Sequence, residues 1–174
     1  LENSLVQAHR HKNHVGLMFL DIDRFKNIND TLGHKIGDEF LKLIGSRLQS
    51  SVRSVDTVSR LGGDEFAIVI KEASDTHYME LLARKIIETL SRPYEVDQHT
   101  LYIGASVGTA IGPRDGRTVE MLMRSADLAL YRSKDQGGGA FTHYEPKLHV
   151  QAEERRVMEM ALRKAPENDE LSLN

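Results

Sequence analysis

The stretch Arg60-Leu61-Gly62-Gly63-Asp64-Glu65-Phe66 interrupts a strand-like pattern with two glycines and two acids. Residues 57–61 before it alternate between polar and apolar side chains, and residues 66–70 after it are apolar. This order predicts a β-hairpin with Asp64 and Glu65 at its turn. Paired glycines let another molecule approach the backbone closely, and adjacent carboxylates can hold a cation and polarise a hydroxyl group. A glycine turn with solvated acids is the alternative interpretation.

A second pair of acids favours the functional interpretation. Residues 15–20 form a short apolar run that is followed by Asp21 and Asp23. This is typical of a buried strand whose carboxyl end presents carboxylates. In a palm-like sheet, the end of one strand lies beside the turn of the neighbouring hairpin. Two acid clusters that meet in this way predict a two-metal arrangement for phosphoryl or nucleotidyl transfer.

The rest of the chain alternates between helical and strand-like periodicity. Amphipathic helices are expected at residues 37–48, 78–90, 119–133 and 152–164, and further strands at 94–96, 100–103, 106–111 and 141–144. The order predicts an α/β (α+β) fold, in which a mixed central sheet of the ferredoxin-like or polymerase-palm type has flanking helices.

Composition limits the possible ligands. The chain has 174 residues and no cysteine, so disulfides and thiolate metal sites are excluded and a hard cation such as Mg²⁺ is favoured. Its 23 basic and 26 acidic residues give a net charge of −3, which argues against DNA or RNA as a partner. No apolar run approaches the roughly 20 residues of a membrane span. We therefore expect a cytoplasmic segment without membrane contact, although the full-length protein could be membrane-tethered.

The chain resembles the GGDEF family of diguanylate cyclases over about Val15 to Tyr144. Four motifs agree with the family in order and spacing. They are Asp21-Ile22-Asp23-Arg24-Phe25-Lys26-Asn27-Ile28-Asn29-Asp30, Gly33-His34 with Gly37-Asp38, Arg60-Leu61-Gly62-Gly63-Asp64-Glu65-Phe66, and Ala126-Asp127-Leu128-Ala129-Leu130-Tyr131. The resemblance implies an enzyme that joins two GTP molecules into cyclic di-GMP. It also implies a homodimer, because each subunit binds one GTP and the two must face each other.

The resemblance also assigns roles to the acids. It implies that Asp21, the main-chain carbonyl of Ile22 and Asp64 bind Mg²⁺, with Mn²⁺ as a possible substitute. Asp64 or Glu65 would then help to deprotonate the attacking 3′-hydroxyl group. Mg²⁺ prefers oxygen ligands and shares its shell with substrate phosphates, which agrees with this assignment.

Further residues match the substrate-binding positions of the family. Asn29 and Asp38 match the positions that recognise guanine, and a carboxylate can accept hydrogen bonds from its N1 and N2 donors. Asp38 could instead cap the following helix. Phe25 and Lys26 stand where a helix begins after the strand, so free amide groups and a lysine can surround phosphates. The remaining substrate positions are His34, Gly62, Gly63 and the phosphate-binding Lys134. His34 could also be a packing or capping residue.

Arg53 and Asp56 have the Arg-x-x-Asp pattern that the family places just before the glycine turn as its product-inhibition site. Arg84 stands where a second arginine completes that site. Arginine stacks on guanine and forms forked contacts with phosphates, which suits a guanine dinucleotide. A chance spacing is the alternative. His9, His11 and His14 are interpreted as a solvated surface.

The sequence departs from the family pattern in three places. It starts after the usual opening segment Asp-x-Leu-Thr-Gly-Leu-x-Asn-Arg, and Gly138 stands where the family has an arginine. Residues 153–165 and 170–173 resemble the start of an EAL-type cyclic di-GMP phosphodiesterase domain. We therefore expect a cyclase domain at residues 1–150 and a helical linker at 151–174, with an EAL domain as the C-terminal partner.

Two functions follow: an active cyclase, or a degenerate module that senses GTP or cyclic di-GMP and regulates the phosphodiesterase. A polymerase-like enzyme would need a basic channel that the net charge does not suggest.

Overall fold

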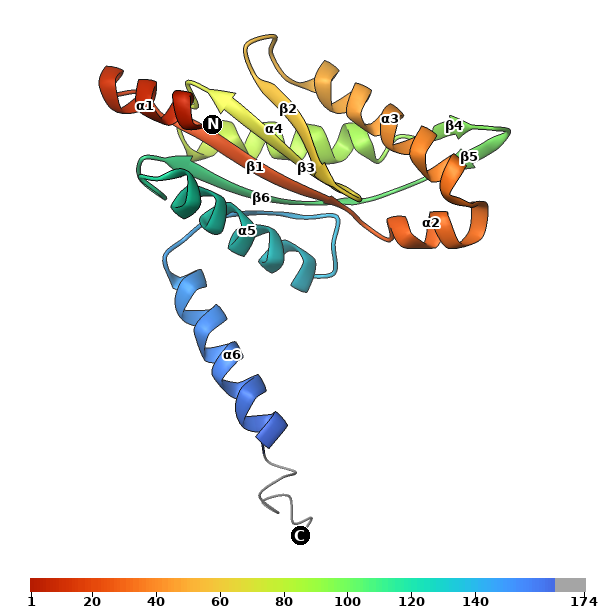
Figure 1. The fold of residues 1–174 in the computed structure, drawn as a ribbon. Helices are drawn as coiled ribbons and strands as arrows, with labels where there is room; N and C mark the ends of the chain where they lie inside the picture. Colours follow the sequence, from red (N-terminus) through yellow and green to blue (C-terminus); the bar gives the residue numbers. More distant parts are fainter. Residues whose placement is uncertain (165–174) are drawn as a thin grey trace. The chain divides into compact units, whose positions relative to one another are not determined.

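The computed structural model describes residues 1–164. A compact unit extends from Leu1 to Tyr144, and a second unit begins at Glu145 (Figure 1). Each unit is described by itself.

A five-stranded sheet forms the centre of the first unit, with the strand order β2-β3-β1-β6-β7. Its strands are β1 (Val15–Ile22), β2 (Thr57–Gly62), β3 (Glu65–Lys71), β6 (Ala105–Gly112) and β7 (Phe141–His143). The central strand β1 runs antiparallel to both β3 and β6, whereas β7 runs parallel to β6. The apolar run in β1 is buried on both faces because it has a neighbour on each side and helices above and below. The predicted mixed sheet with flanking helices is confirmed.

Five helices and a small hairpin complete this unit. They are α1 (Glu2–His11), α2 (Phe25–Leu32), α3 (His34–Ser51), α4 (Thr76–Leu90), α5 (Val119–Asp135), β4 (Tyr94–Val96) and β5 (His99–Leu101). The helix predicted at residues 37–48 is longer at both ends than its apolar spacing indicated. It begins directly after Gly33, which ends α2 in a conformation with φ of 88°.

The two faces of the sheet carry different helices, as Figure 1 shows. Met18, Leu20 and Ile22 of β1 belong to the core cluster that includes the buried side chains of α3 and α4. On the other face α5 approaches β6 closely, since a Cβ atom added to Gly108 would lie 2.1 Å from the backbone nitrogen of Leu130. This close packing brings the last turn of α5 to the end of β1, where the acids lie.

The second unit contains α6 (Lys147–Lys164), whose side chains are mostly exposed. Arg156 forms an ion pair with Glu153, and Arg155 forms one with Glu159. The segment predicted as a linker is therefore helical as far as it is described, and its helix begins earlier, at Lys147. Residues 165–174, which include the EAL-like segment 170–173, lie outside the described residues. In the described chain, no helix is long and apolar enough to cross a membrane.

Candidate active site

The acids of the glycine turn lie beside the end of β1. Asp21 is directly opposite Glu65 in the antiparallel register of β1 and β3. The backbone N–H of Ile22 donates a hydrogen bond to the carbonyl oxygen of Asp64 at 3.2 Å. Because β2 and β3 are joined at this turn, the hairpin places Asp64 and Glu65 next to Asp21.

Lys134 joins this group from the last turn of α5. Its Nζ atom donates a hydrogen bond to Asp21 Oδ2 at 2.6 Å. Burial is the largest influence on Asp21 and raises the pKa of its carboxyl group. The hydrogen bond from Lys134 lowers that pKa, whereas the charges of Asp64 and Glu65 raise it further. The site is therefore rich in negative charge that one lysine only partly offsets.

The oxygen atoms at the end of β1 fit a hard cation. In residues 1–164, no three His, Asp or Glu side chains gather closely enough to hold an ion by themselves. Mg²⁺ at nucleotide sites commonly takes one or two carboxylates and completes its shell with water and phosphate oxygens. The carboxylates of Asp21 and Asp64 and the adjacent carbonyl of Ile22 suit that mode better than an all-protein cage.

Asp23, the second acid at the end of β1, has partners that differ from those of Asp21. Its Oδ1 atom accepts a hydrogen bond from Ser106 Oγ at 2.7 Å, and its Oδ2 atom accepts one from the backbone N–H of Gly139 at 2.8 Å. Asp23 is therefore held by contacts of its own, and a joint role with Asp21 stays a prediction. Both oxygens of Asp23 are engaged by protein donors from other elements.

The two predicted guanine-recognition residues lie on α2 and α3. Asp38 is an exposed residue within α3 and cannot be its N-cap, because Gly33 holds that position. With Leu41, Arg60 and Phe66 it lines a groove of about 490 Å³ between α3 and the β2–β3 hairpin.

Asn29 lies close to Gly37 on the facing helix. Its Oδ1 atom is buried without a hydrogen-bond partner among the described residues. It would lie 1.8 Å from a Cβ atom at Gly37, so only glycine leaves room for this side chain.

The start of α2 supplies backbone amides for an anion. Phe25 is the first residue of this helix, and within the described chain no side chain caps the first turn. The Phe25 ring is buried in the core and stacks on Phe40, so only its main chain is available. Lys26 is exposed beside it. His34 is also exposed, at the first position of α3, so packing does not explain it.

Comparison with known proteins settles the family. The model of the family described as "Diguanylate cyclase, GGDEF domain" matches residues 1–140. The chain belongs to the GGDEF family. This confirms the resemblance that the four motifs indicated.

The relatives of this GGDEF domain are named for different activities. The "Bifunctional diguanylate cyclase/cyclic di-GMP phosphodiesterase MucR" of Pseudomonas aeruginosa is 38% identical over 174 residues, which is 100% of this chain and 25% of MucR. The "Cyclic di-GMP phosphodiesterase NbdA" of the same species is 38% identical over 160 residues, 92% of this chain and 20% of NbdA. The chain thus spans a quarter or less of these relatives. The crystal structure of the GGDEF domain of TpbB from P. aeruginosa has a TM-score of 0.81 at 35% identity, covering 83% of this chain and 91% of that one.

The GGDEF domain also brings Arg53 and Asp56 together, before β2. The Asp56 carboxylate is buried and accepts hydrogen bonds from the backbone and side chain of Arg53 and from the backbone N–H of Lys71. This leaves the Arg53 side chain 46% exposed, with its guanidinium 5.6 Å from the ring of Tyr78. Arg84 lies on α4, the helix that also carries Tyr78, and it donates two hydrogen bonds to Glu80. Its part in a product site stays a prediction.

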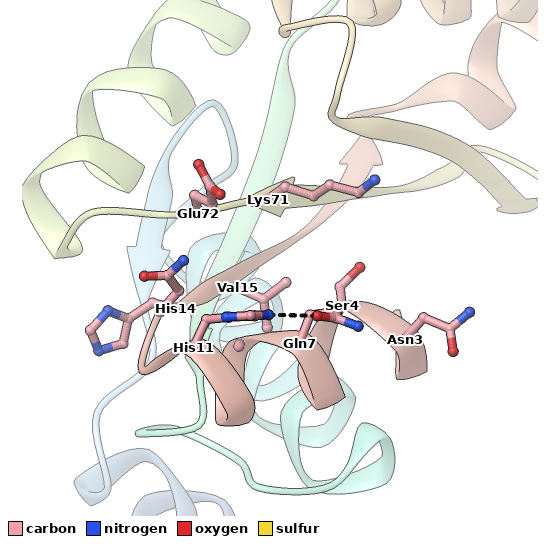
Figure 2. Close-up of a pocket in the computed structure, with 10 residues that line it drawn as sticks. Asn3, Ser4, Gln7, His11, His14, Val15, Lys71 and Glu72 are labelled. Carbon is pink, nitrogen blue, oxygen red and sulfur yellow. Dashed lines mark hydrogen bonds between the residues drawn. The ribbon is translucent and has the colours of Figure 1, made fainter.

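A pocket of about 330 Å³ lies between α1 and the neighbouring ends of β1 and β3, away from the acids (Figure 2). His11 and His14 line it together with Lys71 and Glu72. His11 forms a 3.0 Å hydrogen bond with Gln7. All three histidines of this region are exposed, as the interpretation of a solvated surface requires.

Two groups of contacts in the GGDEF domain were missed by sequence reasoning. One is the set of partners around Asp23. The other joins Asp115 to Arg114 at 2.8 Å and to His143 at 3.2 Å. Burial raises the pKa of Asp115, but hydrogen bonds from His143, Arg114 and the backbone of Ile111 lower it to about 2. No local motif marks either group, because each depends on a partner that is distant in the chain: Ser106 and Gly139 for Asp23, and His143 for Asp115.

Proposed function

We propose that this chain condenses two GTP molecules into cyclic di-GMP with release of pyrophosphate. The observation that supports this most directly is the meeting of Asp21 with Asp64 and Glu65 beside a groove that contains Asp38. The groove suits a base, and the acids suit transfer at the α-phosphate.

Base recognition would rest on α2 and α3. The carboxylate of Asp38 can accept from both N1–H and the N2 amino group of guanine, a pair of donors that adenine lacks. Asn29, whose side chain lies against Gly37 on α3, would add an amide contact. The apolar side chains of Leu41 and Phe66 line the same groove and can cover the faces of the ring.

The triphosphate would lie across the end of β1. The uncapped amides at Phe25 and Lys26 favour an anion at the start of α2. Lys26 and Lys134 supply positive charge on either side. The backbone at Gly62 and Gly63 is exposed and lets the substrate approach the turn.

The chemical step requires proton removal and charge stabilisation. We infer that Glu65 or Asp64 accepts the proton of the 3′-hydroxyl group as its oxygen attacks the α-phosphate of the other GTP, and pyrophosphate leaves. The reciprocal attack by the other 3′-hydroxyl group closes the ring and releases a second pyrophosphate. Mg²⁺, or Mn²⁺ in its place, would be held by Asp21, the Ile22 carbonyl and Asp64 and would neutralise charge on the α-phosphate and the pyrophosphate. Each site holds one GTP, so two copies of the chain must face each other. GTP as substrate favours a cytoplasmic location.

A second candidate is a module that binds GTP or cyclic di-GMP and regulates an attached EAL phosphodiesterase. Gly138 supports it, because the family's arginine is missing at that position. The names of MucR and NbdA also support it, since both include phosphodiesterase activity. In this case the site around Arg53 and Asp56 would bind cyclic di-GMP as a signal.

The deciding experiment incubates the purified chain with GTP and Mg²⁺ and measures cyclic di-GMP and pyrophosphate. Incubation with ATP, and with a chelator, provides the controls. Product formation that needs both GTP and Mg²⁺ supports the cyclase. Tight GTP binding without any product would reject it in favour of the regulatory module.

A further inference from the structure

Asp23 connects three segments that are distant in the sequence. It follows β1, accepts a hydrogen bond from Ser106 of β6, and accepts another from the backbone of Gly139 after α5. These contacts span 83 and 116 positions of the chain. The side chain is half-buried, and its own backbone N–H donates to the carbonyl of Gly104 at 2.9 Å.

Glycine surrounds this carboxylate. A Cβ atom at Gly104 would lie 2.8 Å from Asp23 Oδ2, and one at Gly138 would lie 2.9 Å from the same atom. Gly137, Gly138 and Gly139 all have positive φ, at 103°, 79° and 62°. The loop therefore has a backbone that side chains rarely adopt, and it closes directly onto Asp23.

The loop begins at the end of the helix that carries Lys134. The N–H of Gly137 donates to the carbonyl oxygen of Lys134 at 3.0 Å. Lys134 in turn reaches Asp21, which lies two residues before Asp23. The lysine is thus joined to the end of β1 twice, through its own side chain and through the loop that follows it.

We propose that Asp23 is a positioning residue, which holds the Gly137–Gly139 loop against the end of β1 and so fixes Lys134 where it can meet the phosphates of GTP. The part that concerns GTP rests on the proposed function. The contact of Asp23 with the loop does not. A chain of three glycines has the largest backbone entropy to lose, so an anchor is needed to keep it in one conformation.

The charge of Asp23 is not needed for this role, and that separates it from a metal-binding role. In Asp23→Asn, the amide oxygen can accept from Gly139 and the amide nitrogen can donate to Ser106 Oγ. Asp23→Ala loses both contacts. Ser106→Ala is the matched control, since it removes one contact and leaves the carboxylate in place.

The test compares these three variants with the unchanged chain. Lys134 reactivity toward an amine-modifying reagent and amide exchange at Gly139 are measured by mass spectrometry, with exposed Lys26 as the internal reference. In Asp23→Ala we expect both to rise by about tenfold, and the KM for GTP to rise by about tenfold with a change in kcat of about threefold or less. Asp23→Asn should restore all of these values, and Ser106→Ala should be intermediate.

Two results would overturn the proposal. One is an Asp23→Asn variant that folds normally and yet behaves like Asp23→Ala, because the charge itself would then be required. The other is an Asp23→Ala variant with unchanged loop exchange and unchanged Lys134 reactivity. If the unchanged chain neither binds nor converts GTP, the proposed function fails, while exchange and reactivity still decide whether Asp23 holds the loop and the lysine.

Discussion

Lys134 Nζ lies 2.6 Å from Asp21 Oδ2, although the two residues are 113 positions apart in the chain. The contact places one positive charge against a carboxyl group whose pKa is raised by burial, lowered by this lysine and raised again by Asp64 and Glu65. The net direction is upward. Ionisation of Asp21 therefore reduces the stability of the fold. The same negative charge attracts cations to the site.

Replacing Asp21 with Asn should stabilise the metal-free protein at neutral pH. A carboxyl group with a raised pKa in the folded state favours folding most when it is protonated, and this contribution is lost as pH rises through the folded pKa. We expect a slightly higher melting temperature for Asp21→Asn at pH 7, and a difference that shrinks as pH falls through the raised pKa of folded Asp21 and is gone by about pH 4. Thermal melts across this pH range check the sign. Addition of Mg²⁺ with GTP should stabilise only the unchanged chain, and equal stabilisation of both would contradict the metal assignment.

Asp64→Ala should abolish most turnover and leave the fold intact. The residue lies at a turn and contributes little to packing, so its loss should change the free energy of unfolding by about 0.5 kcal/mol or less. Turnover should fall by about a hundredfold or more, because both the metal site and the proton acceptor are affected. Assays of cyclic di-GMP formation beside thermal melts measure both effects. Equal activity in the variant would rule out the proposed mechanism.

Asp38→Ala should weaken the preference for GTP over ATP. Loss of the acceptor for two guanine donors is worth about 1–3 kcal/mol, which is about tenfold to a hundredfold in the ratio of kcat/KM values. Glu39→Ala is the matched control, since Glu39 is the exposed neighbour on α3 and does not line the groove. If the preference of Asp38→Ala for GTP over ATP is unchanged, Asp38 does not recognise guanine.

Arg53→Ala should remove binding of cyclic di-GMP outside the active site. The fold should survive, because Asp56 keeps its bonds to the backbone N–H groups of Arg53 and Lys71. A calorimetric titration measures the number and strength of binding events. Arg92→Ala serves as the control, because it removes an exposed arginine that is paired with Glu88 and is not one of the predicted site residues. Tight binding with an unchanged number of sites in Arg53→Ala would refute the inhibitory role.

Asp115→Asn should destabilise the fold in a pH-dependent manner. The lowering of the pKa from 3.8 to about 2 corresponds to about 2 kcal/mol in favour of the folded state at neutral pH. A lowered pKa stabilises above the unfolded value, so the difference between variant and unchanged chain should be full at pH 7 and fade between about pH 4 and pH 2. Urea denaturation at several pH values measures it. A difference that is constant with pH would show that charge is not its cause.

The sequence predicted the hairpin and the sheet well, because strands and turns can be recognised from the local order of apolar residues, polar residues and glycines. It predicted the neighbourhood of Asp21 and Asp64 because strand ends and turns meet at one edge of such a sheet. It did not reveal the partners of Asp23, which are 83 and 116 residues away and follow no local pattern. Gly138 shows the same limit. The sequence shows that an arginine is missing there, but only the structure shows that a side chain at this position would adopt a strained φ of 79° and that its Cβ atom would lie 2.9 Å from Asp23 Oδ2.

The strand order places β2 at an edge, where in the described part of the chain it pairs only with β3. Nearly all of its residues are exposed. Edge strands open more easily than central ones, so the free energy of local opening should be lower at β2, which leads into the glycine turn, than at the central strand β1. If the chain is the proposed cyclase, heat should therefore abolish turnover before it unfolds the core, and the gap between the two temperatures would measure the stability of the glycine turn relative to that of the core.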